Sequence, residues 1–142
     1  MPAASRTITI HRPVDAVFAF VADGTNGPKW RSGVLDVALV SGSGAGARYR
    51  QGVKGPGGRR IDADYAVTAY EPNRLIAFRA TAGPVRPTGE FRFEDLGTET
   101  RLTFSLEAEL GGWKRLLMSG PVQQTMDAEM AALDRLMELL ET

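Results

Sequence analysis

The sequence feature that most constrains the fold is a strictly alternating stretch that leads into a single amphipathic helix. In "TRLTFSLEAEL" (residues 100–110), Leu102, Phe104, Leu106 and Ala108 alternate with polar side chains. This period of two indicates a strand with one buried and one solvated face. Apolar residues then recur every three or four positions across residues 122–140. That spacing predicts one long amphipathic helix of about 20 residues. A one-faced sheet and a lone helix can bury their apolar sides only against each other.

The upstream residues extend this pattern into a series of strands joined by tight turns. Alternating or turn-bounded segments predict strands at residues 6–11, 34–40, 48–54, 59–70, 74–81, 90–94 and 100–110. Two short helices are expected after the first strand, one opened by Pro13 and ending near Asp23, the other within residues 26–33. Pro121 in "SGP" is expected to interrupt the C-terminal helical region, because proline cannot donate to an ongoing helix. The predicted fold class is α+β, with a curved seven-stranded antiparallel sheet wrapped around a long C-terminal helix.

Composition limits the chemistry that the chain can perform. Its 142 residues suffice for one domain with a sizeable core, and nothing within residues 1–142 reads as a linker or a repeat. It contains no cysteine and one histidine, His11, which excludes disulfides, thiolate metal sites and multi-histidine sites. We therefore expect no metal and no cofactor. Neither a signal-peptide pattern nor a run of ~20 apolar residues is present, which predicts a cytoplasmic protein without a transmembrane segment.

Four local patterns resemble those of one protein superfamily. They are "ITIHRPVDAVFAFVAD" (8–23), "NGPKWRSGV" (26–34), "VTAYEPNRLIAFRA" (67–80) and "GEFRFEDLGTETRLTFSLEAEL" (89–110). The sequence is similar to the START/Bet v 1-like (SRPBCC) superfamily, and within it to the polyketide cyclase/dehydrase and lipid transport branch. The resemblance covers nearly the whole chain and implies a helix-grip fold. Members bind lipids, sterols, polyketides or hormones, and some cyclise or dehydrate aromatic polyketides, so the resemblance does not decide the function.

Side chains that the apolar pattern places on the inner faces of the strands and the helix are the candidates for lining a ligand cavity. They are Trp30, Tyr49, Gln51, Tyr65, Phe78, Phe91, Phe104, Trp113, Met118, Met126 and Met130. A solid core made of the same residues is the competing interpretation. Gln51 and the phenol of Tyr65 are the polar groups expected to orient a ligand. Trp30 is expected to close the core or form the cavity rim, while Lys29 and Arg31 point to water.

Other motifs have simpler interpretations. The glycine run at residues 42–46 precedes a strand rather than a helix, so a hairpin turn is favoured over a phosphate-binding loop. His11 is expected at the surface, and Asp62 with Asp64 on the solvated face of its strand. The basic segment from Arg48 to Arg60 could attract an anionic partner, or it could be an ordinary solvated hairpin.

The sequence thus predicts a protein that binds a small apolar or aromatic ligand, such as a lipid or polyketide, between sheet and C-terminal helix. The first alternative is a polyketide aromatase/cyclase or dehydrase-type enzyme, in which Tyr65 acts with Arg79 or Gln51. The second is an interaction module that uses its basic edge. No catalytic motif is recognisable, no nucleic acid is expected as partner, and the chain is expected to be a monomer or homodimer.

Overall fold

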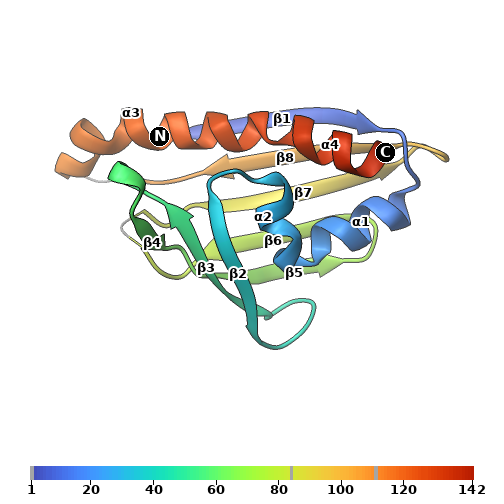
Figure 1. Cartoon of the computed structure of the whole chain (residues 1–142), viewed down its shortest axis with the longest axis horizontal. Coiled ribbons are helices and arrows are strands. Elements are labelled where there is room, and N and C mark those ends of the chain that lie inside the picture. The colour runs from blue at the N-terminus through green and yellow to red at the C-terminus, as the bar shows by residue number, and fades with distance from the viewer. Residues whose placement is uncertain (1, 84, 111) are drawn as a thin grey trace.

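The larger layer of the molecule is one antiparallel sheet, as the alternating segments predict (Figure 1). The computed structural model describes residues 2–83, 85–110 and 112–142, with side chains except at positions 56 and 112–119. The strands lie in the order β1-β8-β7-β6-β5-β3-β2, and β4 pairs with β3. Their bounds are β1 (Ala3–Ile10), β2 (Val34–Ser41), β3 (Arg48–Lys54), β4 (Arg60–Asp62), β5 (Tyr65–Glu71), β6 (Leu75–Ala80), β7 (Thr88–Asp95) and β8 (Thr100–Glu107).

The predicted strand over residues 59–70 is divided into β4 and β5, and the register against β3 is the same on both sides of the break. The break falls at Ala63 and Asp64. The carboxylate of Asp64 accepts the backbone N–H of Gln51 at 3.0 Å. Ala63 keeps a backbone bond to the Gln51 carbonyl at 2.8 Å. The carboxylate of Asp64 thus replaces a backbone carbonyl as the hydrogen-bond acceptor for β3. The predicted sheet architecture is confirmed, and its fourth strand is interrupted.

Two short helical pieces follow β1, as predicted. Helix α1 (Val14–Ala22) ends at Asp23, whose carboxylate accepts the backbone N–H of Thr25 at 3.0 Å and opens the 3-10 turn Gly24–Asn26. Helix α2 (Gly27–Trp30) comes next. The glycine run after β2 forms the predicted hairpin connection, in which Gly42, Gly44 and Gly46 all have positive φ, a conformation that glycine adopts without strain.

The C-terminal helical arm differs from the prediction in where it breaks. Helix α3 (Gly112–Ala131) continues through Pro121, so the predicted interruption there is wrong. A proline ring clashes with the backbone N–H and the Cβ of the residue before it, and here that residue is Gly120, which has no Cβ. The arm instead has a slight break at Ala132, before α4 (Leu133–Glu141). The Ala132 N–H still bonds to the carbonyl of Ala128, so α3 and α4 run on as one arm along the sheet (Figure 1).

The core is densest where α4, the start of β8 and the end of β1 meet. Ile10, Leu102, Leu133 and Leu136 are all fully buried there. Leu136, which lies outside the predicted apolar stripe, faces the core, whereas Met137, which that stripe predicted to be inward, is only half-buried. Towards the other end of the arm, beneath α3, the same two layers enclose a cavity. The fold therefore places this cavity between α3 and the centre of the sheet.

Candidate functional site

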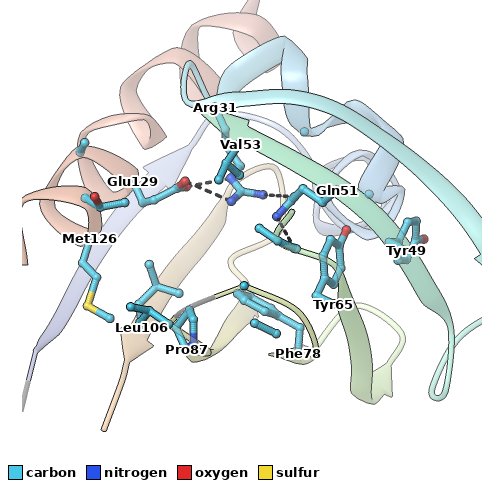
Figure 2. Close-up of a pocket in the computed structure, with 18 of the residues that line it drawn as sticks. Arg31, Tyr49, Gln51, Val53, Tyr65, Phe78, Pro87, Leu106, Met126 and Glu129 are labelled. Atoms are coloured by element: carbon cyan, nitrogen blue, oxygen red, sulfur yellow. Dashed lines mark hydrogen bonds and ion pairs between the residues drawn. The ribbon is translucent and has the colours of Figure 1, made fainter. Parts of the chain in front are cut away.

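The cavity has a volume of about 620 Å³, within the ~300–1,000 Å³ range typical of small-molecule sites. Residues of α1, α2, strands β3 to β8 and α3 contribute to its wall (Figure 2). Lys54, Asp62 and Gln124 belong to the wall and are also exposed to solvent, so they mark the rim. Most of the wall is apolar or aromatic. A site of this kind suits an apolar molecule with few polar groups.

Paired aromatic rings form much of the wall because they occupy alternate, inward positions on neighbouring strands. Tyr49 on β3 stacks on Tyr65 on β5, with ring centroids 4.9 Å apart. Phe91 on β7 stacks on Phe104 on β8 at 4.2 Å. Trp30 meets both of these phenylalanines edge-on, at 6.2 and 6.4 Å. Trp30 is only 5% exposed and also lines the cavity, so it both packs in the core and forms part of the wall.

A charged pair inside this apolar wall was not predicted from the sequence. The Nε and Nη2 atoms of Arg31 donate to the two carboxylate oxygens of Glu129 on α3, at 2.7 and 3.0 Å. The side chains of Arg31 and Glu129 keep 20% and 15% of their surface exposed. The expectation that Arg31 points to water is therefore wrong. Arg31 is the first residue after α2, where the backbone becomes extended and directs the guanidinium across the cavity to α3 (Figure 2).

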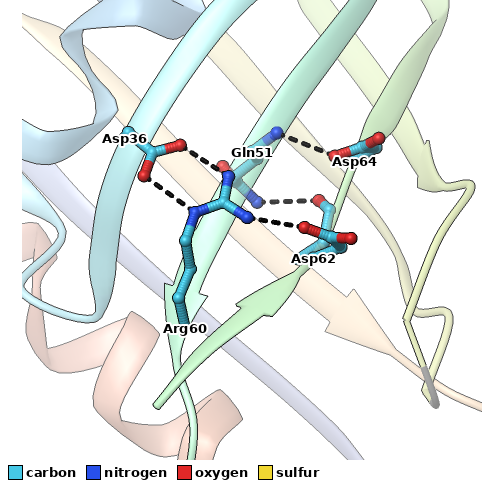
Figure 3. Close-up of polar contacts among 6 residues, drawn as sticks. Asp36, Gln51, Arg60, Asp62 and Asp64 are labelled. Atoms are coloured by element: carbon cyan, nitrogen blue, oxygen red, sulfur yellow. Dashed lines mark hydrogen bonds and ion pairs between the residues drawn. The ribbon is translucent and has the colours of Figure 1, made fainter. Parts of the chain in front are cut away.

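Gln51 completes the polar cluster and also bonds to the link between β4 and β5 (Figure 3). Its side-chain oxygen accepts a hydrogen bond from Arg31 Nη1 at 3.2 Å, and its Nε2 donates to the carbonyl of Ala63 at 3.1 Å. The break between β4 and β5 leaves that carbonyl available to the side chain. Gln51 lies on the wall, as its strand phase predicts. Its polar atoms are bonded to protein groups, so the side chain is fixed before any ligand binds.

Tyr65 supplies the remaining polar group of the inner wall. Burial raises the pKa of Tyr65 above its usual value, and the charge of Arg31 offsets this only in part. The phenol is therefore neutral at physiological pH and can donate a hydrogen bond. Its hydroxyl lies against Gly24, where any side chain would collide with it. The glycine after Asp23 thus allows the Tyr65 ring to reach its position.

Burial alone would disfavour the charged form of Arg31. The adjacent carboxylate of Glu129 outweighs this effect, so the pKa of Arg31 rises above its ordinary value. The guanidinium is also 5.9 Å from the centre of the Trp30 ring, within cation–π range. The inner cavity therefore holds a permanent cation and its partner anion among aromatic groups, a combination that can recognise or polarise an oxygen atom.

The sequence as a whole matches one protein family. Residues 1–138 match the family described as polyketide cyclase/dehydrase and lipid transport. The chain belongs to this family. No curated protein matches the chain in sequence. Across the residues that the structure describes, we find no helix both long enough and apolar enough to span a bilayer.

Solved structures agree with the family at the level of the fold. A Thermus thermophilus protein superposes with a TM-score of 0.81 at 20% identity, over 98% of this chain and 97% of that one. A Streptomyces aromatase/cyclase gives a TM-score of 0.75 at 20% identity, over 98% of this chain and 93% of that one. A START superfamily protein from Mycobacterium smegmatis gives a TM-score of 0.75 at 19% identity, over 97% and 98%. These likenesses confirm the helix-grip α+β fold.

Within this family member, most of the side chains predicted for the cavity lie on its wall. They are Trp30, Tyr49, Gln51, Tyr65, Phe78, Phe91, Phe104 and Met126. Met130 is buried, but it packs in the core outside the cavity wall. The side chains of Trp113 and Met118 fall outside the described part of the structure.

Arg79 does not belong to the site. It is exposed and alternates with Phe78 and Ala80, which face the cavity, so its side chain lies on the outer face of the sheet. The enzyme hypothesis that paired Tyr65 with Arg79 is therefore wrong in its choice of arginine. Arg31 occupies the inner position instead. The signal for its partner was present in the sequence, since Glu129 follows Met126 by three residues and so borders the buried stripe of the helix.

The remaining charged candidates lie at the surface. His11 is exposed and approaches Glu99 at 2.9 Å and Glu141 at 3.7 Å. Arg60 bridges Asp36 and Asp62 at 2.8 and 2.6 Å, which neutralises part of the predicted basic segment (Figure 3). Arg48, Arg50, Lys54 and Arg59 are exposed. In the described structure this segment is therefore a solvated hairpin, and its far end borders the cavity rim.

Proposed function

We propose that the protein binds a small, largely apolar or aromatic molecule in the cavity between α3 and the sheet. The observation that carries this proposal is the cavity itself. It has about 620 Å³ of space enclosed mostly by aromatic and aliphatic side chains, in a chain that belongs to the polyketide cyclase/dehydrase and lipid transport family. A lipid or an aromatic polyketide is the ligand class that these walls favour. A cytoplasmic location and a monomeric or homodimeric state remain predictions from the sequence.

Native mass spectrometry of freshly purified protein tests the proposal directly. We expect a fraction of the protein to carry a small molecule that is lost on denaturation. A second test uses the two tryptophans, Trp30 and Trp113. In a Trp113→Phe variant the fluorescence comes from Trp30 on the cavity wall, and titration with an apolar aromatic probe should change it saturably. No bound molecule and no fluorescence change with any apolar probe would contradict ligand binding.

The second candidate function is catalysis of polyketide ring closure, and the polar cluster favours it. Arg31 and the neutral phenol of Tyr65 both border the same inner cavity. In an aldol closure a carbon next to one carbonyl loses a proton and attacks a second carbonyl carbon, whose oxygen becomes negative. Donors fixed beside that oxygen stabilise the developing charge. Protonation of this alkoxide oxygen gives a hydroxyl and balances the proton that the carbon lost, and elimination of that hydroxyl with a neighbouring hydrogen then releases water.

The enzyme hypothesis is tested with a synthetic poly-β-ketone thioester followed by mass spectrometry. Wild-type protein should accelerate formation of a product that lacks one water molecule. A Tyr65→Phe variant, which keeps the ring and loses the donor, should be slower by about 10–100-fold while the probe still binds. Binding of the thioester without any acceleration by the wild type would leave the protein as a ligand carrier only.

A further inference from the structure

We propose that Glu129 makes the cavity selective for ligands whose buried polar group is neutral, such as a ketone, ester or phenol, and excludes free carboxylates. The inference rests on the proposed ligand binding, and it specifies the ligand class. A fatty acid or an aromatic acid has the right apolar body for this cavity. It is the charge inside the cavity that discriminates against it.

The charges that border the cavity fall into two groups. Five charged side chains contribute to its wall: Asp23, Arg31, Lys54, Asp62 and Glu129. Asp23, Lys54 and Asp62 are exposed and belong to the rim, and Asp62 is paired with Arg60. Only Arg31 and Glu129 are largely removed from water. The inner charges therefore sum to zero before a ligand arrives.

Glu129 uses the guanidinium in the same way that a ligand carboxylate would. It accepts from both Nε and Nη2 of Arg31, the two-bond arrangement in which arginine binds carboxylates best. An incoming carboxylate has two options. It can share Arg31 with Glu129, which places two anions beside one cation in a poorly solvated space. Alternatively it can displace Glu129 and leave that side chain buried without its partner. Both options leave one negative charge inside without a partner, which is strongly unfavourable.

A neutral oxygen meets no such penalty. Arginine has five N–H groups, and the bonds to Glu129 and Gln51 use three of them. The two that remain, on Nη1 and Nη2, can donate to a carbonyl or phenol oxygen. The hydroxyl of Tyr65 is a further neutral donor on the same wall. Because Glu129 and Gln51 hold the guanidinium from two sides, these donors are already oriented when the ligand enters (Figure 2).

Lys54 offers the one competing arrangement that the wall contains. A ligand acid could bind in reverse, with its apolar body inside and its carboxylate at the rim beside Lys54. Lys54 is exposed, so water screens that interaction and makes it weak. The reversed pose also leaves the two free N–H groups of Arg31 facing the apolar body. We therefore expect it to contribute little to affinity.

The test compares two probes of nearly the same shape, 2-acetylnaphthalene and 2-naphthoate, by isothermal titration calorimetry near neutral pH. A carboxylic acid with a pKa of ~4 is fully ionised under these conditions. Wild-type protein should bind the ketone at least about tenfold more tightly than the carboxylate. In Glu129→Gln the order should reverse, because Arg31 then lacks its anion and the naphthoate can supply one. Asp127→Asn is the matched control: it removes a negative charge from an exposed position two residues away and should leave the wild-type ratio unchanged.

The outcomes separate the selectivity from the binding itself. Equal or tighter binding of naphthoate by the wild type would overturn the role of Glu129 and leave ligand binding intact. If Lys54→Gln then lost the binding of naphthoate, the reversed pose would account for it. Failure of both probes to bind would count against the proposed function and would also overturn this inference. If Glu129→Gln does not fold, the wild-type ratio still tests whether carboxylates are excluded, since it needs no variant, and tighter binding of naphthoate would still overturn the inference.

Discussion

The two halves of the space between the helical arm and the sheet have opposite characters. Beneath α4 the space is solid, and the side chains of Ile10, Leu102, Leu133 and Leu136 are fully buried. Beneath α3 it is hollow and holds the cavity. The sheet is continuous under both halves, and β8 contributes Leu102 to the solid half and Leu106 to the wall of the hollow half. The difference therefore comes from what the helical arm presents to the same sheet.

The inward side chains of the arm explain the contrast. Helix α4 presents leucines at Leu133, Leu136 and Leu140, and all three are buried. Helix α3 presents Met126 and the charged Glu129 to the cavity. A carboxylate and its arginine need space and polar partners, and leucine-like packing around them would leave unsatisfied groups. Stability is therefore concentrated under α4, whereas α3 covers the cavity. Matched substitutions in the two halves test this contrast.

Truncation of leucines along β8 should give the largest difference. Leu102→Ala removes a side chain that is 0% exposed, and we expect a loss of about 4 kcal/mol in the free energy of unfolding. Leu106→Ala shortens a side chain that already borders empty space, so fewer contacts are lost and about 2 kcal/mol is expected. Urea denaturation followed by circular dichroism measures both. Equal losses would mean that the cavity is filled or collapsed in solution.

Enlargement of valines should give the next effect, with opposite consequences in the two halves. Val17→Phe forces a ring into the packed core outside the cavity wall, where Val17 is 0% exposed, and should cost about 2–3 kcal/mol through overpacking. Val53→Phe places the same ring on the cavity wall and should cost less than about 1 kcal/mol. Val53→Phe should instead weaken binding of 2-acetylnaphthalene by at least about tenfold. A Val53→Phe protein that is as unstable as Val17→Phe would show that the wall has no room.

These contrasts also show which parts of the molecule could be predicted from the sequence. The alternation of apolar residues correctly oriented Tyr49, Gln51, Tyr65 and Phe104, because the direction of a strand side chain follows from its position in the strand. The pair of Arg31 and Glu129 could not be found in this way. Its members are 98 residues apart, and α2 has only four residues, too few for a period to show which side is buried. Long-range pairing of charges depends on the assembled fold.

The C-terminal helix shows a second limit of prediction from sequence. Proline usually ends a helix, which made Pro121 the expected break, yet α3 passes through it and the arm breaks at Ala132. The preceding glycine relieves the steric conflict, and Thr125 Oγ1 donates to the Pro121 carbonyl at 3.1 Å. Similarly, the split of β4 from β5 depends on a bond between Asp64 and Gln51 that no local pattern reveals.

Removal of one charge from the cavity pair should have an intermediate effect. Arg31→Met leaves Glu129 largely buried without its partner, and we expect a loss of about 2 kcal/mol. Full burial would cost ~3–5 kcal/mol, but both side chains retain some contact with water. The double variant Arg31→Met with Glu129→Leu should lie closer to wild type, because no charge is left unpaired. A double variant less stable than Arg31→Met would show that the pair, rather than its desolvation, dominates.

The exposed ion pairs should have the smallest effect, and two of them allow a comparison. Asp134 on α4 bonds to Arg6, and Asp36 on β2 bonds to Arg60. These hydrogen bonds hold the pKa of each aspartate below its ordinary value. A carboxylate with a lowered pKa in the folded state stabilises the fold above its unfolded pKa of ~3.9, and this stabilisation is lost as the pH falls through the folded value.

Asp134→Asn and Asp36→Asn should therefore each lower the melting temperature slightly near neutrality and leave it nearly unchanged at the acid end, which flattens the acid side of the curve of melting temperature against pH. Calorimetric melting between pH ~2 and ~6 measures this, and added salt should shrink the difference from wild type because exposed pairs are screened. The two variants should behave alike, although one lies beside the solid half and the other beside the cavity. A larger acid effect for Asp36→Asn would mean that the β2–β4 surface supports the cavity wall, since Arg60 also holds Asp62 on that wall.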